Sequence, residues 1–305
     1  MHSAPPQSPA VRHPLSTRIR TALAGCLVAT MTAVGGVAWA LDRFVVEHVE
    51  VTSASTAEVT AAVATTARSA GFSVTTETVG TGSDAAVVTT AVIDLDDITQ
   101  LRSAFADDAY GENITELPSV IADQVGASLA INGDYYGFRD TGIVIRNGVL
   151  YRDEGTREAL VLYRDGSAAI VDETATTGEE LLAAGAWQTL SFGPALVEGG
   201  EVVAGIDAVE VDTNVGNHSI QGDQPRTAVA VLEDGSIAFV VVDGRSDASA
   251  GMTLTELAAY AQSLGAVSAY NLDGGGSSTM VVDGEVVNAP SNGGERATSD
   301  ILYVA

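Results

Sequence analysis

The sequence predicts an α+β domain built on a mixed β-sheet, with hairpins and at least one βαβ crossover. Apolar residues form 46% of the 305 residues, enough to bury a core without disulfides or structural metals. Four turn signals separate short β-branched runs and predict hairpins: Asn147-Gly148, Asp165-Gly166, Asp234-Gly235 and Asp283-Gly284. One well-marked helix lies between two further strands, and this arrangement predicts the crossover.

The helix of the crossover is predicted from its start, its apolar face and its end. Thr253 and Glu256 form a Thr-x-x-Glu capping box, and Gly265 supplies a stop. The apolar residues between them recur at helical spacing: Leu254, Leu257, Ala258, Ala261 and Leu264. Strands at 237–242 and 267–272 flank the helix, so we expect both to run in the same direction within one sheet.

The N-terminal part has the features of an export signal. Residues 21–41 carry no charge, follow a short stretch containing arginines, and end at the small-x-small pattern Ala38-Trp39-Ala40. Residues 1–40 are therefore predicted to be a signal peptide or signal anchor. The protein would then be extracytoplasmic, either secreted or anchored to the cell membrane by this segment. For residues 41–84 we expect a helix at 56–69 and a linker at 80–84, before a main domain at 85–305.

Composition limits the classes of function. All 14 basic residues are arginine, against 40 acidic residues, and every acidic residue follows the N-terminal segment. Such a chain repels nucleic acid and anionic lipid surfaces, so neither is an expected partner. Cys26 is the only cysteine, and only His48 and His218 lie beyond the N-terminal segment. This scarcity argues against a histidine-rich zinc site and against a Ser-His-Asp triad.

Strand topology predicts where the chemistry lies. The two parallel strands would deliver Asp243 and Asp273 to the same sheet edge, where open α/β sheets bind ligands. Taking Asp234-Gly235 as a two-residue turn places Arg226 opposite Asp243. The same argument for Asp283-Gly284 returns Asn288 to the loop after Asp273. With the end of a further strand at 128–131, one rim is expected to gather Asn132, Asp134, Arg226, Asp243, Arg245, Asp273, Ser277 and Asn288.

The run Gly274-Gly275-Gly276 gives up backbone entropy without supplying side chains, so something must approach the main chain closely there. Exposed main-chain N–H groups beside an arginine suit a phosphate. A chain without lysine has no Walker A motif, no G-x-G-x-x-G follows a strand, and Ser277 lies in no nucleophile elbow. Plainer explanations remain: an Asp-Gly turn at Asp243, a surface ion pair with Arg226, and tyrosines at 135 and 136 that cover the core or form a sugar platform.

Seven segments in order carry a family resemblance over roughly residues 87–305. They are Ala130-Ile131-Asn132-Gly133-Asp134-Tyr135-Tyr136, Ser191-Phe192-Gly193-Pro194-Ala195-Leu196-Val197, Pro225-Arg226-Thr227-Ala228, Val242-Asp243-Gly244-Arg245, Asn271-Leu272-Asp273-Gly274-Gly275-Gly276-Ser277-Ser278-Thr279-Met280, Val287-Asn288-Ala289-Pro290 and Gly294-Glu295-Arg296. Together they resemble the phosphodiester glycosidase family. The resemblance implies hydrolysis of an α-linked sugar 1-phosphodiester outside the cytoplasm. It implies a site at Asn132, Arg226, Thr227, Asp243, Arg245, Asp273, Gly274, Gly275, Gly276, Ser277, Asn288 and Arg296.

These residues suggest a division of roles. Arg226 and the main-chain N–H groups of 274–277 would hold the phosphate, and Arg296 and Asn288 would bind sugar or phosphate oxygens. A carboxylate, with Asp273 ahead of Asp243 and Asp134, would activate water or stabilise an oxocarbenium-like transition state. No cofactor is certain, although close aspartates also bind Ca²⁺ or Mg²⁺. The expected partner is a phosphate-linked glycan of the cell envelope or an extracellular polysaccharide. The alternatives are a phosphodiesterase that cleaves the P–O bond and a non-catalytic exopolysaccharide-binding protein.

Overall fold

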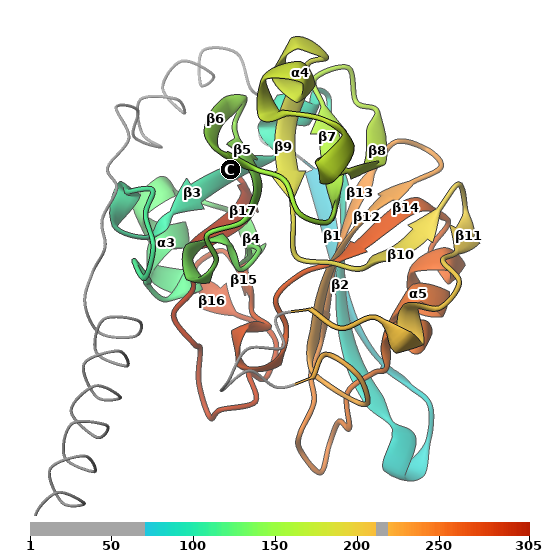
Figure 1. Cartoon of the computed structure of the whole chain (residues 1–305). Helices are drawn as coiled ribbons and strands as arrows, with labels where there is room; N and C mark the ends of the chain where they lie inside the picture. Colours follow the sequence, from blue (N-terminus) through green and yellow to red (C-terminus); the bar gives the residue numbers. More distant parts are fainter. Residues whose placement is uncertain (1–70, 212–218) are drawn as a thin grey trace, which may run out of the picture. The chain divides into compact units, whose positions relative to one another are not determined.

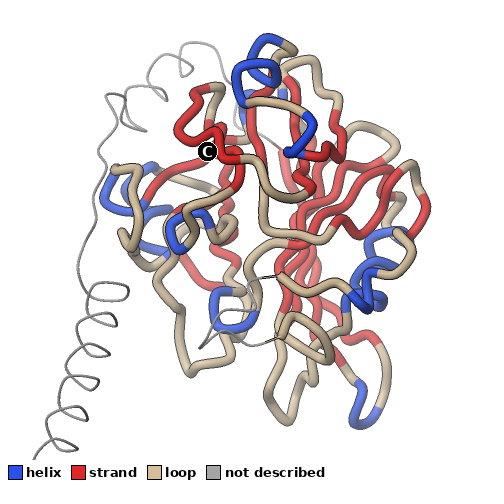
Figure 2. The backbone as a smooth tube through the Cα atoms, in the orientation of Figure 1, coloured by secondary structure: helices blue, strands red, loops and turns tan. Residues whose placement is uncertain are grey.

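The computed structural model describes residues 71–211 and 219–305. The expected signal segment at 1–40 and the expected helix at 56–69 lie outside the described residues. Within the described parts, no helix is both long enough and apolar enough to cross a membrane. The predicted α+β class is confirmed: strands dominate, and a few short helices cover them (Figure 2).

The largest sheet has seven strands in the order β1-β2-β13-β12-β14-β10-β11, with every neighbouring pair antiparallel. Its strands are β1 (Gly71–Val79), β2 (Ala86–Asp94), β13 (Ile237–Val242), β12 (Arg226–Leu232), β14 (Ala266–Asn271), β10 (Ala195–Glu198) and β11 (Glu201–Val202). Because β13 and β14 both pair antiparallel with β12, they run in the same direction. Helix α5 (Leu254–Ser263) connects them, so the predicted βαβ crossover is confirmed, with β12 lying between its strands.

Helix α5 forms and packs as its sequence predicts. The Thr253 side chain accepts from the Glu256 N–H and the Glu256 side chain caps Thr253 in return, so the capping box is complete. Four of its apolar residues are buried against the sheet: Leu254, Leu257, Ala258 and Ala261. The facing strands present small side chains such as Ala228 and Ala230, which let the helix approach the sheet closely.

A five-stranded antiparallel sheet in the order β16-β15-β4-β17-β3 lies beside the first (Figure 1). Its strands are β16 (Glu285–Val286), β15 (Met280–Val282), β4 (Leu129–Asn132), β17 (Asp300–Val304) and β3 (Arg102–Phe105). Helix α3 (Pro118–Val125) packs on it through Ile121 and Ala122. The main core cluster joins residues of both sheets, including Phe239, Tyr270 and Leu302, so the sheets share one hydrophobic core.

Two small sheets complete the described residues. One is the hairpin of β5 (Gly142–Arg146) and β6 (Val149–Glu154). The other is a three-stranded sheet in the order β8-β7-β9. Its strands are β7 (Glu158–Tyr163), β8 (Ala168–Asp172) and β9 (Ala186–Leu190), with helix α4 (Gly178–Ala183) between β8 and β9. Trp187 of β9 is fully buried and donates its indole N–H to the Leu101 carbonyl at 2.6 Å, which ties this sheet to the common core.

All four hairpin turns predicted from Asn-Gly and Asp-Gly are confirmed by strand pairing. Two other predictions are wrong. Residues 80–84 are not a linker but the turn between β1 and β2, whose nine residues pair in register, so the domain includes at least residue 71 onward. The β12–β13 register differs by one residue: Leu232 N–H donates to Ser236 O, and Arg226 consequently pairs with Val242 rather than Asp243.

Candidate functional site

The loop after β14 crosses from the seven-stranded sheet to β15 of the five-stranded sheet (Figure 1). This glycine loop, residues 273–279, begins at Asp273 and contains a short 3-10 turn, Gly275–Ser277. The registers Arg226 with Val242 and Ala228 with Asn271 place the start of β12 and the ends of β13 and β14 at one edge of the sheet. The prediction that these three segments meet at a single edge is therefore confirmed.

Each glycine of this loop has a neighbouring group close to where a Cβ would lie, and the restriction is strictest at Gly274 and Gly275. A Cβ on Gly274 would lie 2.7 Å from the Pro225 carbonyl oxygen, a backbone atom that cannot move aside. Gly275 has φ +61 and lies against the Arg245 guanidinium, 3.3 Å from where its Cβ would be. A Cβ on Gly276 would lie 2.2 Å from Asn292 Nδ2. The predicted close approach to the main chain of this loop is thus confirmed. The approaching groups belong to the protein itself: Pro225, Arg245 and Asn292.

A cavity of about 160 Å³ opens beside this loop. Among the described residues its wall holds three arginines and a single carboxylate, in a chain where acidic residues outnumber arginines 40 to 14. The lining residues are Tyr135, Phe192, Val211, Ser219, Ile220, Gln224, Pro225, Arg226, Arg245, Asn271, Leu272, Asp273, Gly274, Gly275, Gly276 and Arg296. The cavity therefore gathers positive charge against the trend of the whole molecule.

Arg226 is 3% exposed, and its described hydrogen-bond partners are backbone carbonyls. Its Nε donates to Met252 O at 2.8 Å and its Nη2 to Gly222 O at 2.7 Å. Nη1 has no hydrogen-bond partner among the described residues, and no described carboxylate lies within ion-pair distance. Burial lowers the pKa of the Arg226 guanidinium to about 10; the charge of Asp223 partly opposes this shift and that of neighbouring Arg245 adds to it. An anion in the cavity would supply the counter-charge that Arg226 lacks.

Asp273 is the one carboxylate that the described residues contribute to the cavity wall. Its Oδ2 accepts from Ser277 Oγ at 2.6 Å and from Arg296 Nη2 at 3.0 Å, and Arg296 Nε donates to Ser277 Oγ at 2.8 Å. The Asp273 side chain is 14% exposed and that of Arg296 45%. Burial raises the pKa of the Asp273 carboxyl, and Arg296 and Ser277 only partly oppose this. Asp273 and Arg296 therefore line the cavity as one hydrogen-bonded unit, which the sequence did not predict, and Ser277 lies buried behind them rather than in the cavity wall.

Asn132 and Thr227 lie behind the glycine loop rather than in the cavity wall, and both are completely buried. Asn132 Nδ2 donates to the Asp273 carbonyl at 2.8 Å, and its Oδ1 accepts from Thr227 Oγ1 at 2.8 Å and from Thr279 N–H at 3.2 Å. This set of bonds ties the end of β4 to β12 and to the loop. Their predicted contact with substrate is not found in this arrangement, in which both residues support the loop from behind.

Asp243 and Asn288 also lie outside the cavity wall. Asp243 Oδ1 accepts from Asn288 Nδ2 at 3.0 Å and from Ala289 N–H at 2.9 Å. Asn288 in turn donates to Ser278 O at 3.0 Å and accepts from Met280 N–H at 2.9 Å. The predicted return of Asn288 to the glycine loop is confirmed, but the pair braces the loop against β13. Burial raises the pKa of the Asp243 carboxyl.

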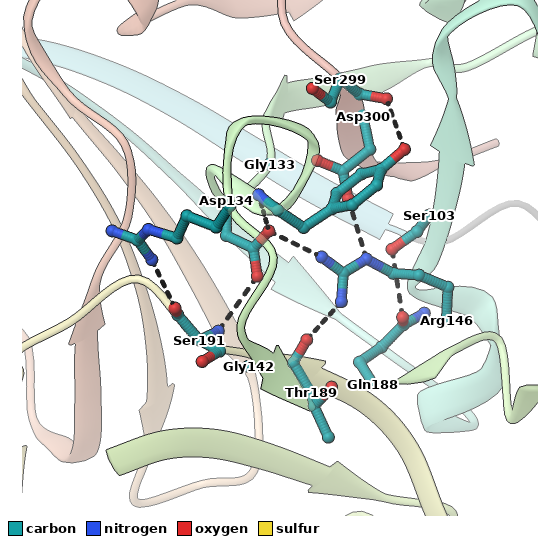
Figure 3. A network of polar contacts seen from close by, with 12 residues as sticks. Ser103, Gly133, Asp134, Gly142, Arg146, Gln188, Thr189, Ser191, Ser299 and Asp300 are labelled. Atoms are coloured by element: carbon teal, nitrogen blue, oxygen red, sulfur yellow. Dashed lines mark hydrogen bonds and ion pairs between the residues drawn. The ribbon is translucent and has the colours of Figure 1, made fainter. Parts of the chain in front are cut away.

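Asp134 belongs to a buried ionic network (Figure 3) and is not among the residues that line the cavity. Its Oδ1 forms an ion pair with Arg146 Nη2 at 2.9 Å and accepts a hydrogen bond from Tyr136 N–H at 3.0 Å, and its Oδ2 accepts from Ser191 N–H at 3.0 Å. Arg146 also donates from Nε to Asp300 Oδ2 at 2.8 Å. With both oxygens engaged and a side-chain exposure of 2%, Asp134 does not fit the predicted role of a catalytic carboxylate.

The same network positions the aromatic wall of the cavity. Tyr135 follows Asp134 in the chain, and Phe192 follows the Ser191 that Asp134 holds. Both rings line the cavity, with centroids 6.3 Å apart in an edge-to-face arrangement. Tyr136 is buried elsewhere, in edge-to-face contact with Phe105. Of the two tyrosines considered for a sugar platform, Tyr135 alone is in the right place.

Several residues at the site were not predicted. Gln224, Asn271 and Phe192 line the cavity, and Arg146 and Asp300 complete the buried network. Gln224 adjoins the Pro225-Arg226 segment, but a lone glutamine carries no signal in a sequence. Within the described ranges, no three histidine, cysteine or acidic side chains come together. The predicted aspartates do not converge, so the described donors do not fit the cation site considered from the sequence.

The fold and the site define a class of protein: an α+β domain with an arginine-lined cavity beside a glycine-rich loop. Residues 125–305 match the phosphodiester glycosidase family, and the chain belongs to that family. The Bacillus subtilis SPbeta prophage-derived uncharacterized protein YomE is 31% identical over 205 residues, which are 64% of this chain and 30% of that protein. The bovine N-acetylglucosamine-1-phosphodiester alpha-N-acetylglucosaminidase is 35% identical over 81 residues, 27% of this chain and 15% of the bovine protein.

The match therefore spans less than a third of the length of either relative. Among solved structures, the zebrafish N-acetylglucosamine-1-phosphodiester alpha-N-acetylglucosaminidase catalytic domain superposes with a TM-score of 0.64 at 23% identity. That superposition covers 85% of this chain and 88% of the zebrafish chain. A hypothetical protein from Synechocystis has a TM-score of 0.59 at 18% identity, covering 77% of this chain and 62% of that chain. These two structures share the fold.

Proposed function

We propose that the protein is a hydrolase that cleaves the glycosidic C1–O bond of a sugar 1-phosphodiester in the cavity beside the glycine loop. The observation that carries this proposal is Arg226, a buried guanidinium with no carboxylate partner among the described residues, in a wall with Arg245 and Arg296. A phosphate is the anion that such a site suits. The bovine and mouse relatives, named for a sugar 1-phosphodiester, support the substrate class.

The phosphate would bind between Arg226, Arg245 and the main chain of the glycine loop. The N–H groups of Gly275 and Ser277 already donate within the protein, to Pro225 O at 2.9 Å and Gly274 O at 3.1 Å. Those of Gly274 and Gly276 have no acceptor among the described residues. These two N–H groups, rather than the whole loop, would therefore donate to phosphate oxygens.

Asp273 would act at the sugar carbon. Water attacks C1, the C1–O bond breaks, and its electron pair stays on the oxygen of the departing phosphate monoester. Asp273 would stabilise the positive charge that develops at C1 and take the proton released by the attacking water. The Asp273–Arg296 ion pair and the Ser277 hydrogen bond hold the carboxylate in one orientation. Tyr135 and Phe192 offer the sugar ring an apolar surface on the opposite wall.

The test is turnover on a panel of α-sugar 1-phosphodiesters, with free sugar and phosphate monoester measured as products. We expect Asp273→Asn and Arg226→Met each to reduce kcat/KM by at least about 100-fold. Gln262→Glu, an exposed change on α5, serves as the control and should retain activity. If Asp273→Asn turns over normally while Arg226→Met does not, the role given to Asp273 is wrong. Binding of the glycan without turnover would favour a carbohydrate-binding protein.

Hydrolysis in ¹⁸O-water separates the second candidate, a phosphodiesterase. Label in the sugar hydroxyl supports attack at C1, whereas label in the phosphate supports attack at phosphorus. Because the described carboxylates do not converge, chelator treatment is expected to leave turnover unchanged. The natural substrate would be a phosphate-linked glycan of the cell envelope or an extracellular polysaccharide. Fractionation of cells that express the full chain tests whether the protein is secreted or membrane-bound, as this setting requires.

A further inference from the structure

The three cavity arginines are held by different kinds of acceptor. Arg226 donates to two backbone carbonyls. Arg245 donates from Nε at 3.0 Å and from Nη2 at 2.6 Å to a single neutral atom, Gln224 Oε1. Within the part of the chain that the structure describes, only Arg296 is paired with a carboxylate, Asp273. Two of the three guanidiniums are therefore oriented without an ion pair to a described carboxylate, which leaves their charge available to a ligand.

A short backbone bridge couples the two unneutralised arginines. Gln224 N–H donates to Met252 O at 3.2 Å, and Met252 N–H donates back to Gln224 O at 3.0 Å. The Met252 carbonyl also accepts from Arg226 Nε. Gly251 is needed beside this bridge, because it has φ +104 and a Cβ there would lie 2.5 Å from the Gln224 backbone. The Gln224 side chain thus contacts Arg245. Its main chain bonds to Met252, whose carbonyl holds Arg226.

We propose that Gln224 is a positioning residue that sets the charge of the phosphate subsite, by orienting Arg245 with a neutral acceptor. This proposal rests on the proposed function. Cleavage at C1 converts a phosphodiester of charge −1 into a monoester that carries close to two negative charges near neutral pH. Two guanidiniums at full charge interact more strongly with the developing monoester than with the bound diester. The subsite would therefore stabilise the transition state more than the ground state.

The decisive variant is Gln224→Glu, which keeps the shape of the side chain and its acceptor oxygen but neutralises Arg245. We expect kcat/KM to fall roughly 10- to 100-fold, with more of the loss in kcat than in KM. Gln224→Ala frees Arg245 without neutralising it and should have the smaller effect. Gln262→Glu adds the same charge on the exposed side of α5, away from the cavity lining, and should behave as wild type.

Binding of inorganic phosphate, measured by calorimetry, separates this inference from the proposed function. Gln224→Glu should weaken phosphate binding roughly 10-fold relative to Gln262→Glu, whether or not any diester is turned over. If that loss is seen in a protein that hydrolyses no diester, the proposed function fails while the charge-setting role stands. The role is overturned if Gln224→Glu binds phosphate as tightly as wild type. It is also overturned if Gln224→Ala, shown to be folded by circular dichroism, loses as much affinity as Gln224→Glu.

Discussion

Replacing Asp300 with asparagine is expected to remove a decline in stability that the wild-type protein shows as the pH rises from about 5 to about 7. One guanidinium, Arg146, faces two carboxylates in the interior, with Asp300 Oδ2 at 2.8 Å and Asp134 Oδ1 at 2.9 Å (Figure 3). Burial raises the pKa of Asp300 to about 7, because Arg146 does not offset both burial and the charge of Asp134. At Asp134 burial acts in the same direction, but Arg146 and the Ser191 N–H together hold its pKa below the usual value.

The sign follows from proton binding. The Asp300 carboxyl has a pKa of about 3.9 in the unfolded chain, so between that pH and about 7 the native state holds a proton that the unfolded state has released. Its contribution to stability is complete below the unfolded pKa and is lost as the pH rises through the native one. One proton corresponds to at most about 1.4 kcal/mol for each pH unit. Over two pH units, the stability of Asp300→Asn relative to wild type should rise by about 2–3 kcal/mol.

The assay is urea unfolding followed by circular dichroism at about pH 5, 6 and 7, with the free energy of unfolding extrapolated to water. Asp283→Asn is the matched control, because Asp283 is exposed in the β15–β16 turn, where asparagine is equally suited to the left-handed backbone. The control curve should run parallel to wild type. Parallel curves for Asp300→Asn and wild type would refute the argument, because they would mean that the native Asp300 carboxyl holds no extra proton in this pH range.

Three further outcomes are expected. Arg146→Met should destabilise the protein by about 3–5 kcal/mol in denaturant unfolding, because it leaves two buried carboxylates without their cation. Gly274→Ala should lower both stability, by about 1–3 kcal/mol, and kcat/KM, because its Cβ meets the Pro225 carbonyl at 2.7 Å. Gly294→Ala, with open space around the new methyl group, should do neither. Thr253→Ala should reduce the free energy of unfolding by about 1 kcal/mol through loss of the α5 cap, and Thr253→Ser should restore most of it.

The parts of the fold that could be predicted from the sequence are those fixed by local chemistry. Asp283-Gly284 closes its hairpin as expected because both residues adopt positive φ, as a two-residue hairpin turn requires. The turn at Asp234-Gly235 looks the same in sequence, yet Glu233 joins its loop and shifts the register by one residue. Residues 80–84 resemble a linker for the same reason that they make a turn: glycines and small polar residues suit both. A linker and a turn differ here only in whether the flanking segments pair as strands. A local sequence pattern does not contain that information.

For the candidate site, sequence patterns identified the segments better than the direction of their side chains. Asn132 and Asp134 end the expected strand beside the site, but both turn into the protein. Their partners decide this. Asp134 meets Arg146 and Asp300, which lie far from it along the chain or on another strand. A buried ion pair of this kind depends on tertiary packing, so neither the pairing nor the resulting loss of Asp134 from the cavity could be read from spacing.

Asp134 and Asp243 hold the fold together instead of lining the cavity, and this affects the proposed mechanism. Most glycosidases place two carboxyl groups across the scissile bond, one to protonate the leaving group and one to assist attack at the sugar carbon. Among the described residues, Asp273 alone reaches the cavity, because Asp134 is held by Arg146 and Asp243 by Asn288. For an ordinary glycoside this would leave the acid missing. A phosphate monoester departs as a stable anion, however, and Arg226 and Arg245 can stabilise its charge without donating a proton. In the proposed function, Asp273, Arg226 and Arg245 are thus the groups that cleavage of a sugar 1-phosphodiester would use, without a second carboxyl group to protonate the leaving group.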